Sequence, residues 1–374
     1  MRKQKVLISG GGVPGLSLAV SLASADVDIT LAEPRPPVDA SPTPGKPDGR
    51  TAAIMVDHID WLHELGVWEK VKAWAAPLKT MRVIDASVPH SKATAPHDFN
   101  AADIGLDAFA WNTPIAGLRY ALWQALPSNV TIVERADHTD DYDLVIAADG
   151  RHSSLRDMAG IKASLHDTGQ AALTFVVSHT HDHQNISTEI QRVDGPLTFV
   201  PLPGGHHASV VFVGKIENQQ ALLARGNDAI QNAINQFADG YVIQGDAGLH
   251  PLPFMTVDRL WSGKTIAMAE AAHVLHPLGA QGLNLSLRDA RVLSDLIAKA
   301  LETGTPINHQ LHVMDAYTKA RRADHLLRTG GIMASLDMLK QGAWTGRPRR
   351  LILDALDAMP ALRRLAMKTG FGGR

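Results

Sequence analysis

The chain has no cysteine among its 374 residues, which excludes disulfides, thiolate nucleophiles and cysteine-ligated metals. The absence also suits a reducing compartment, so we expect a cytoplasmic protein. No apolar run approaches the roughly 18 to 20 residues that a membrane-spanning helix needs. The sequence also lacks a G-x-S-x-G serine elbow, an H-E-x-x-H pair and a G-x-x-x-x-G-K-[ST] loop, so it gives no support to hydrolase or P-loop functions.

Charge of one sign is in excess only near the end of the chain. The formal net charge is −2, which gives no reason to expect nucleic-acid binding. From Lys319 onward, however, the sequence has twelve Lys and Arg residues and only four Asp and Glu residues. Leucines interleave with these cations, which predicts basic amphipathic helices that either cap a domain or lie on an anionic membrane or a partner protein. Peripheral contact at the inner membrane is therefore our second expectation for localisation.

The first 33 residues have the pattern of a nucleotide-binding unit. Residues 5–9 predict a buried strand, a glycine-rich turn follows, and a helix and a second strand lead to Glu33. This is a βαβ start with G-x-G-x-x-G and an acidic residue about twenty positions later. The glycines permit a tight turn close to a pyrophosphate, the helix N-terminus faces its charge, and Glu33 can accept from ribose hydroxyls. We therefore predict dinucleotide binding.

The middle of the chain adds a second carboxylate at a strand end. Residues 48–65 predict a helix, and Arg50 near its start is the one cation that the sequence places near the phosphate site, although spacing alone favours a solvated loop arginine. A second helix is predicted over 113–126, with Asn112 as its N-cap. The buried strand 144–148 ends at Asp149, where open α/β sheets bind ligands.

Residues 164–257 differ in pattern and predict an antiparallel α+β insertion. Short strands are expected at 173–177, 188–193, 197–201 and 208–213, with a helix over 221–237. A cleft between this insertion and the nucleotide-binding unit is the default place for a substrate. His179, His181 and His183 would share one face of a strand, and we interpret them as surface histidines at a strand end rather than as metal ligands.

Residues 265–284 combine a strand, an acidic residue and the start of a long helix. Glu270 follows the strand, a Pro/Gly-rich turn comes next, and the helical pattern begins at Leu283. A carboxylate suits sugar-like hydroxyls, whereas a helix N-terminus suits a phosphate or a partly anionic ring. His273 and His276 fall inside this presumed ligand site.

Three separated segments together resemble one family. Residues 10–15 with Glu33, residues 144–150 and residues 265–284 are similar to the three FAD-contacting motifs of class A flavoprotein monooxygenases, which have the p-hydroxybenzoate hydroxylase-like fold. Within that family, residues 276–289 most resemble the signature of the ubiquinone-biosynthesis hydroxylases. The likeness spans residues 5 to about 330.

The resemblance implies an α/β fold with an α+β insertion: a Rossmann-type FAD-binding domain, an antiparallel-sheet substrate domain and a C-terminal helical region. The expected FAD-binding parts are residues 1–80, 111–163 and 261–330. The expected substrate-domain parts are residues 81–110 and 164–260, and the basic helical region is residues 331–374.

The resemblance also implies the residues that hold FAD. The glycines of the first turn lie close to the pyrophosphate, Glu33 binds the adenosine ribose, and the helix that follows residue 282 faces the flavin ring. The implied cofactor-binding residues are Gly10, Gly12, Val13, Pro14, Gly15, Glu33, Arg50, Asp149, Gly150, Glu270, Pro277, Gly279, Ala280, Gln281, Gly282, Leu283 and Asn284. No catalytic residue is assigned; His273 is a candidate by position alone, and no metal is expected.

The implied reaction is hydroxylation of an aromatic ring through a flavin hydroperoxide, with NAD(P)H as reductant and O₂ as the oxygen donor. The implied substrate is a small hydrophobic aromatic molecule of the polyprenylphenol type, and a quinone-biosynthesis complex is a candidate partner for the basic tail. The family's Gly-Asp is replaced by Ala269-Glu270, and residues 134–143 are fewer than the family usually has. Two alternatives follow: a flavin-binding accessory protein of the quinone pathway without turnover, or an FAD hydroxylase of a soluble phenol.

Overall fold

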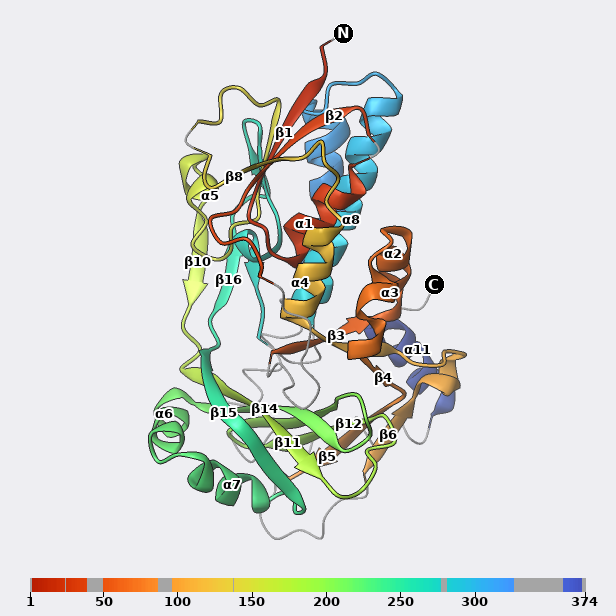
Figure 1. Cartoon of the computed structure of the whole chain (residues 1–374), viewed down its shortest axis with the longest axis vertical. Coiled ribbons are helices and arrows are strands. Elements are labelled where there is room, and N and C mark those ends of the chain that lie inside the picture. Colours follow the sequence, from red (N-terminus) through yellow and green to blue (C-terminus); the bar gives the residue numbers. More distant parts are fainter. Residues whose placement is uncertain are drawn as a thin grey trace.

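Two large β-sheets lie at opposite ends of the long axis of the molecule (Figure 1). The structure is a computed structural model that describes residues 2–23, 25–38, 50–86, 96–136, 138–276, 281–325 and 359–371. Helices accompany both sheets, so the predicted mixed α/β fold class with an antiparallel-sheet insertion is confirmed.

The first sheet has six strands, most of them parallel. Its order is β17 (Trp261–Ser262), β18 (Thr265–Ala267), β9 (Leu144–Ala147), β1 (Gln4–Ser9), β2 (Val27–Ala32) and β8 (Thr131–Val133). All neighbours from β18 to β8 pair in parallel, whereas β17 pairs antiparallel at one edge. The carboxyl ends of β18, β9, β1 and β2 therefore meet at the same edge of the sheet.

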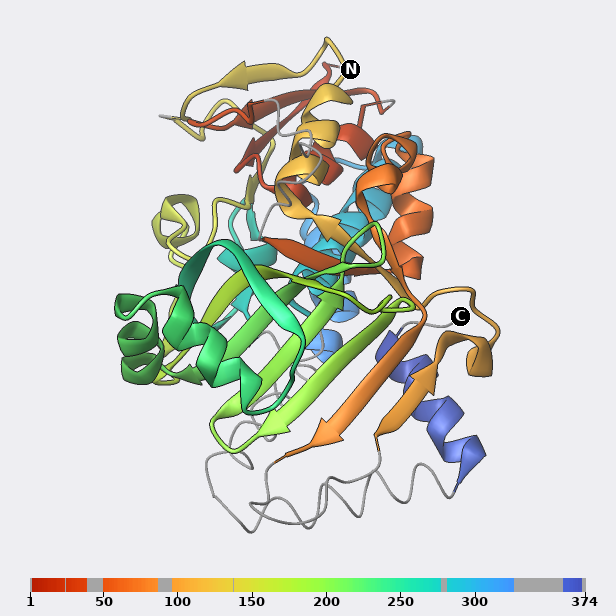
Figure 2. The same cartoon turned by 60° about the horizontal axis from the view of Figure 1, so that its bottom comes forward.

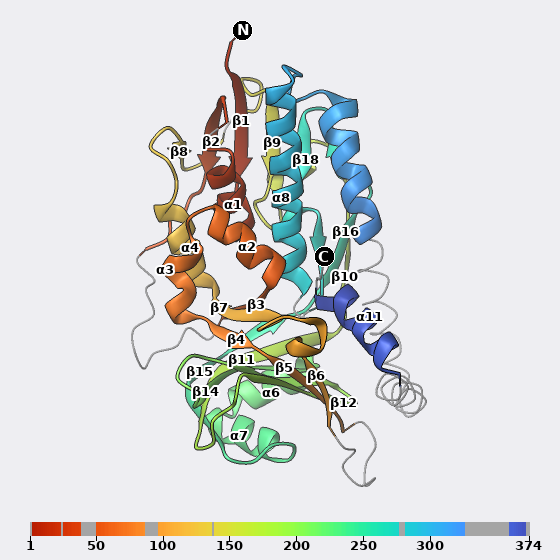
Figure 3. The same cartoon turned by 90° about the vertical axis from the view of Figure 1, so that its right-hand side faces the viewer.

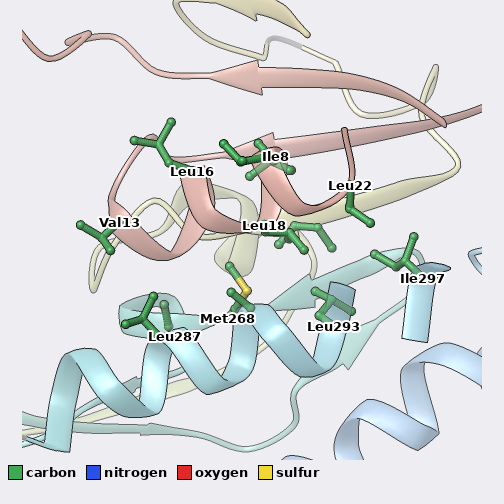
Figure 4. Close-up of a cluster of buried hydrophobic side chains, with 14 of the residues drawn as sticks. Ile8, Val13, Leu16, Leu18, Leu22, Met268, Leu287, Leu293 and Ile297 are labelled. Atoms are coloured by element: carbon green, nitrogen blue, oxygen red, sulfur yellow. The ribbon is translucent and has the colours of Figure 1, made fainter. Parts of the chain in front are cut away.

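Two helices form a packed layer against this sheet. Helix α1 (Val13–Ser21) follows β1, and helix α8 (Gln281–Glu302) comes from the far end of the chain. Figure 4 shows Leu18 of α1 facing α8, with Met268 lying between the α8 side chains Leu287 and Leu293. Burial of these apolar side chains is the main stabilising term at this interface. It fixes the start of α8 relative to the turn after β1.

The second sheet has seven strands in the order β15 (Tyr241–Pro251), β11 (Gln170–His179), β14 (His207–Lys215), β13 (Gly195–Pro201), β12 (Ile186–Arg192), β5 (Thr80–Asp85) and β6 (His97–Asn100). Only β12 and β5 pair in parallel. Two helices, α6 (Ile216–Ala224) and α7 (Asn227–Asn235), cover one face (Figure 2). The single helix predicted over 221–237 is wrong, because Gly226 adopts a φ of +83° and breaks it.

A three-stranded sheet lies between the two large ones, in the order β3 (Thr51–Met55), β7 (Ala110–Pro114) and β4 (Ala76–Leu78) (Figure 3). The helix predicted from residue 48 is wrong here: residues 51–55 are a strand because β7 satisfies their backbone groups, and helix α2 (Val56–Glu64) begins only afterwards. Asn112 lies within β7 and donates from Nδ2 to the Pro201 oxygen at 2.8 Å. It therefore does not cap α4 (Ile115–Gln124), which corrects a second prediction.

A second small sheet joins β10 (Ala163–His166), β16 (Phe254–Val257) and β19 (His273–Val274). Beyond α8, the π-helical turn η5 (Gln310–Met314) leads into a helix over residues 315–325 that runs beside α8 (Figure 3). The other short helical elements that the structure describes are α3 (Trp68–Val71), η1 (Lys72–Trp74), η2 (Ala101–Ile104), α5 (Ser154–Met158) and η3 (Ala269–Ala271).

Part of the basic C-terminal region is a helix, as predicted. Helix α11 (Pro360–Phe371) packs beside η2 and β6, where Arg363 lies 3.8 Å from the Asp103 carboxylate and over the ring of Phe99. Within this region the sequence pattern also predicts helices near 333–340 and 348–358, and both ranges lie outside the described residues. Among the helices that the structure describes, none is both long and apolar enough to cross a bilayer.

Candidate functional site

A cavity of about 830 Å³ lies at the carboxyl edge of the six-stranded sheet. Its wall is built from the turn after β1, the end of β2, the turn after β9, and η3 after β18. The start of α8 closes another side. The fold thus brings together the three segments that the sequence singled out, and it does so because parallel strands present their carboxyl ends at one edge.

Most of the predicted site residues line this cavity. They are Gly10, Gly12, Val13, Pro14, Glu33, Arg50, Asp149, Gly150, Glu270, Gly282 and Leu283, together with His273. Gly15, Gln281 and Asn284 are near it but are not part of its wall. Pro277, Gly279 and Ala280 lie outside the described residues.

The glycine turn serves two physical purposes. Gly10 has a φ of +111°, and a Cβ there would lie 2.2 Å from the Ala148 oxygen; a Cβ on Gly15 would lie 2.0 Å from the Gly10 oxygen. These two glycines therefore let backbone segments touch. Gly12 is the N-cap of α1 and makes no side-chain cap, and Gly12, Val13 and Pro14 line the cavity. The start of α1 is therefore placed to bind an anion through its backbone N–H groups.

Glu33 is held in place by backbone donors. Its Oε2 accepts from the Gly11 N–H at 2.7 Å, and its Oε1 accepts from the Arg35 N–H at 2.8 Å. An ionised carboxylate has about four acceptor positions, so Glu33 retains capacity for ribose hydroxyls. The carboxylate lies on the cavity wall, as that role requires.

Arg119 is a site residue that our sequence reasoning missed. From α4 it donates through Nε to the Gly11 oxygen at 2.6 Å and through Nη2 to the Arg35 oxygen at 2.7 Å, and it lies 3.4 Å from Glu33. Arg35, Arg119 and Arg135 all line the cavity, so Arg50 is not the single cation there, which corrects the sequence prediction. The sequence could have indicated Arg119, because it is the only charged residue within α4.

Asp149 offers an unused acceptor to the cavity. Its Oδ2 accepts from the Ser154 N–H at 3.2 Å, whereas its Oδ1 is buried and has no hydrogen-bond partner among the residues that the structure describes. A buried carboxylate oxygen in this state is costly unless a donor reaches it. A hydroxyl-bearing ligand would supply that donor. Together with the uncapped helix N-terminus, this orphaned oxygen shows that the wall fits a phosphate- and hydroxyl-bearing cofactor such as FAD.

The turn that carries Glu270 has unusual backbone geometry. Ala269 adopts a φ of +55°, in the left-handed region that glycine favours, and Glu270 follows with its side chain on the cavity wall. The start of α8 lies opposite, with Gly282 and Leu283 on the wall. Asn284 has a different role from wall residues, because it accepts from the Met55 N–H and donates to the Ala53 oxygen, tying α8 to β3.

The histidines divide into two groups. His179 ends β11 and His181 lies in the following turn, so the two do not share a strand face as predicted. His276 is fully buried, and its Nε2 lies 3.1 Å from Gln170 Oε1 at the start of β11. Burial lowers the pKa of His276 to about 4, so its ring is neutral at physiological pH. His273 is also buried and contacts Asp289 at 2.7 Å.

The chain resembles curated and structurally known flavoproteins over nearly its whole length. It is 28% identical to the ubiquinone hydroxylase UbiL of Rhodospirillum rubrum, over 98% of this chain and 89% of that protein. It is also 28% identical to the 3-demethoxyubiquinol 3-hydroxylase of Escherichia coli, over 98% of both. The crystal structure of p-nitrophenol 4-monooxygenase PnpA from Pseudomonas putida DLL-E4 superimposes with a TM-score of 0.77 at 17% identity, covering 100% of this chain and 99% of that one.

These findings confirm the resemblance to FAD-dependent aromatic monooxygenases and to the ubiquinone hydroxylases among them. FAD as cofactor and NAD(P)H as reductant are confirmed with it. The family model described as FAD binding domain matches residues 128–325, more than half of the chain. The chain belongs to this FAD-binding family.

Proposed function

We propose that this monooxygenase hydroxylates an aromatic ring of the polyprenylphenol type in ubiquinone biosynthesis. The observation that supports the proposal most directly is that one cavity brings together the N-terminus of α1, Glu33, Asp149 and the start of α8. The curated relatives add support, because two of them are named for hydroxylation in the ubiquinone series.

Each group on the cavity wall has a proposed part in holding FAD. The N–H groups at the start of α1 bind the pyrophosphate, and Glu33 accepts from the adenosine ribose. Asp149 and Glu270 accept from hydroxyls of the flavin chain, while the N-terminus of α8 stabilises negative charge on the ring. Bound FAD supplies the redox and oxygen-transfer chemistry, and the protein orients the substrate and excludes water.

We also propose the domain division expected from the sequence, with FAD held by residues 1–80, 111–163 and 261–330 and the substrate by residues 81–110 and 164–260. Two contacts join these parts close to the cavity. The hydroxyls of Thr51 and Ser209 lie 2.8 Å apart, and His276 reaches Gln170 across the same boundary. Such contacts fix the substrate sheet relative to the flavin end of the cavity.

The test of this function is a visible spectrum followed by a turnover assay. Purified protein, or apoprotein reconstituted with FAD, should show flavin absorption, and a polyprenylphenol should accelerate its NAD(P)H oxidation and yield a hydroxylated product. Because the reaction needs an oriented ring and a dry site, NAD(P)H oxidation without substrate should be slow. A colourless protein that cannot be reconstituted would favour the accessory role, and stimulation by water-soluble phenols alone would favour a different substrate class.

We further propose that helix α11 contacts an anionic membrane surface, from which a polyprenylated substrate could be taken. Leu362 and Leu365 on this helix are 42% and 62% exposed, and Arg364 and Lys368 are exposed beside them. Exposed leucines flanked by cations on a short helix are typical of interfacial binding.

Replacing Leu362 and Leu365 together by glutamine should weaken binding to vesicles that contain anionic lipid by about tenfold, since two leucine side chains lose their apolar burial. Vesicle co-sedimentation measures this. The matched control is Leu165→Gln on β10, a leucine 55% exposed away from α11, which should leave binding unchanged. Equal binding by the double variant and the wild type would rule α11 out as the membrane contact.

A further inference from the structure

A fully buried carboxylate, Asp289 on α8, lies directly behind the turn that carries Glu270. Its Oδ2 accepts from the Ala269 N–H at 3.1 Å and from His273 Nε2 at 2.7 Å. Its Oδ1 accepts from Arg321 Nε at 2.6 Å and from His325 Nε2 at 2.9 Å. Four donors therefore satisfy one carboxylate that has no contact with solvent.

The charge state of Asp289 follows from these partners. Burial by itself raises the pKa of a carboxyl group, but the neighbouring His273 and His325 hold the pKa of Asp289 well below its usual range. The guanidinium of Arg321 is buried beside it and stays positive at any physiological pH. Asp289 is therefore ionised, and the hydrogen bonds to it are charge-assisted.

The two groups bound by Oδ2 bracket the turn. Ala269 begins η3 and His273 follows its end, so a single oxygen atom holds both sides of the short segment that presents Glu270 to the cavity. Ala269 is held in the left-handed region, which is an unfavourable backbone conformation for alanine. Without Asp289, the backbone of Ala269 would be free to leave it.

A metal site is the alternative interpretation of the cluster around Asp289. One ligand atom from each of His273, Asp289 and His325 lies within 4.8 Å of the others, a spacing that a divalent cation could use. Arg321 argues against a cation, because its Nε already lies 2.6 Å from the same carboxylate and would repel one. His273 and His325 also donate from Nε2 to Asp289, so these two nitrogen atoms have no lone pair to offer a metal.

We propose that Asp289 is a positioning residue of the FAD site, which holds Ala269 in its left-handed conformation and thereby aims Glu270 at the cofactor. The inference rests on the proposed function only in that Glu270 is taken to contact FAD. The clamp on residues 269–273 consists of Asp289 with Arg321 and His325, and the last two come from the helix over 315–325. That helix therefore supports the flavin site from behind, although none of its residues lines the cavity.

The test is a double-mutant cycle between Asp289→Asn and Ala269→Gly, read out as the FAD dissociation constant of the apoprotein. Asp289→Asn should raise it about tenfold, because an amide turns a donor toward groups that themselves donate. Glycine adopts the left-handed conformation without strain. Asp289→Asn should therefore raise the FAD dissociation constant by a clearly smaller factor in the Ala269→Gly background. A purely structural role of Asp289 does not produce this difference.

Asp324→Asn is the matched control. Asp324 binds Arg321 at 2.7 Å and also lies near Arg288, and neither of these contacts involves residues 269–273. This variant should leave FAD affinity within about twofold, since it keeps the Asp289 bonds to Ala269 and His273. An equal loss from Asp324→Asn, or equal costs of Asp289→Asn in both backgrounds, overturns the proposal. So does one equivalent of a divalent cation in the wild type that Asp289→Asn removes.

Hydrogen exchange gives a readout that does not depend on cofactor binding or on a stable variant. In wild-type apoprotein, the amide of Ala269 should be protected, because Asp289 accepts its hydrogen bond. Rapid exchange of that amide would overturn the clamp even if FAD binds. Conversely, a protected amide in a protein that binds no FAD would support the clamp and contradict the proposed function instead.

Discussion

Gly15→Ala is expected to destabilise the nucleotide-binding end of the molecule strongly and to abolish FAD binding. A Cβ on Gly15 would lie 2.0 Å from the Gly10 oxygen and 3.3 Å from the Gly10 carbonyl carbon, and both atoms belong to the backbone. Gly10 cannot retreat, because its own backbone already lies against Ala148. The overlap should cost about 3 kcal/mol or more of unfolding free energy, measurable as a lower urea midpoint.

Gly12→Ala is the matched comparison within the same turn. A Cβ there meets nothing closer than the Pro14 ring at 3.8 Å, so the apoprotein should lose at most about 1 kcal/mol, the usual cost of alanine at an N-cap. The methyl group would nevertheless enter the cavity beside the free N–H groups of α1, and FAD affinity should fall. If Gly15→Ala were as stable as Gly12→Ala, the close approach of Gly10 and Gly15 would be wrong.

The flavin end of the fold could be predicted because its signals are local. The strands over 5–9, 27–32, 144–148 and 265–269 are each rich in apolar residues, and each is followed by glycine or a carboxylate. Those strands are present with boundaries shifted by two residues at most. Parallel strands buried on both faces need such runs, and their ligand-binding ends need small or acidic residues, so pattern and position agree.

The errors arose where distant partners decide the structure. Residues 51–55 have an alanine-rich sequence that favours a helix, but pairing with β7 some sixty residues later makes them a strand. The Asp289 cluster was missed for a similar reason. Asp289 has the position of an ordinary polar residue within a helical pattern, and its partners lie 16 to 36 residues away. Only the packing of α8 against η3 and the helix over 315–325 reveals it.

Glu33→Gln should separate the two tasks of this side chain. In the structure, the carboxylate accepts from the N–H groups of Gly11 and Arg35 and lies near Arg119, so it also holds the glycine turn. An amide of the same shape would direct N–H hydrogens toward at least one donor. We expect FAD affinity to fall about tenfold to a hundredfold, because a buried charged hydrogen bond is worth about 1.5 to 3 kcal/mol.

Comparison of FAD with FMN decides which task dominates. FMN lacks the adenosine ribose, so a Glu33 that acts on that ribose should discriminate against FMN in the wild type, and Glu33→Gln should reduce the preference by weakening FAD alone. Asp28→Asn is the control, since Asp28 lies on the same strand but pairs with Lys3 at an exposed site. Should Glu33→Gln weaken both flavins equally, the carboxylate acts through the Gly11 turn and the pyrophosphate site, and the ribose is held by another group on the cavity wall.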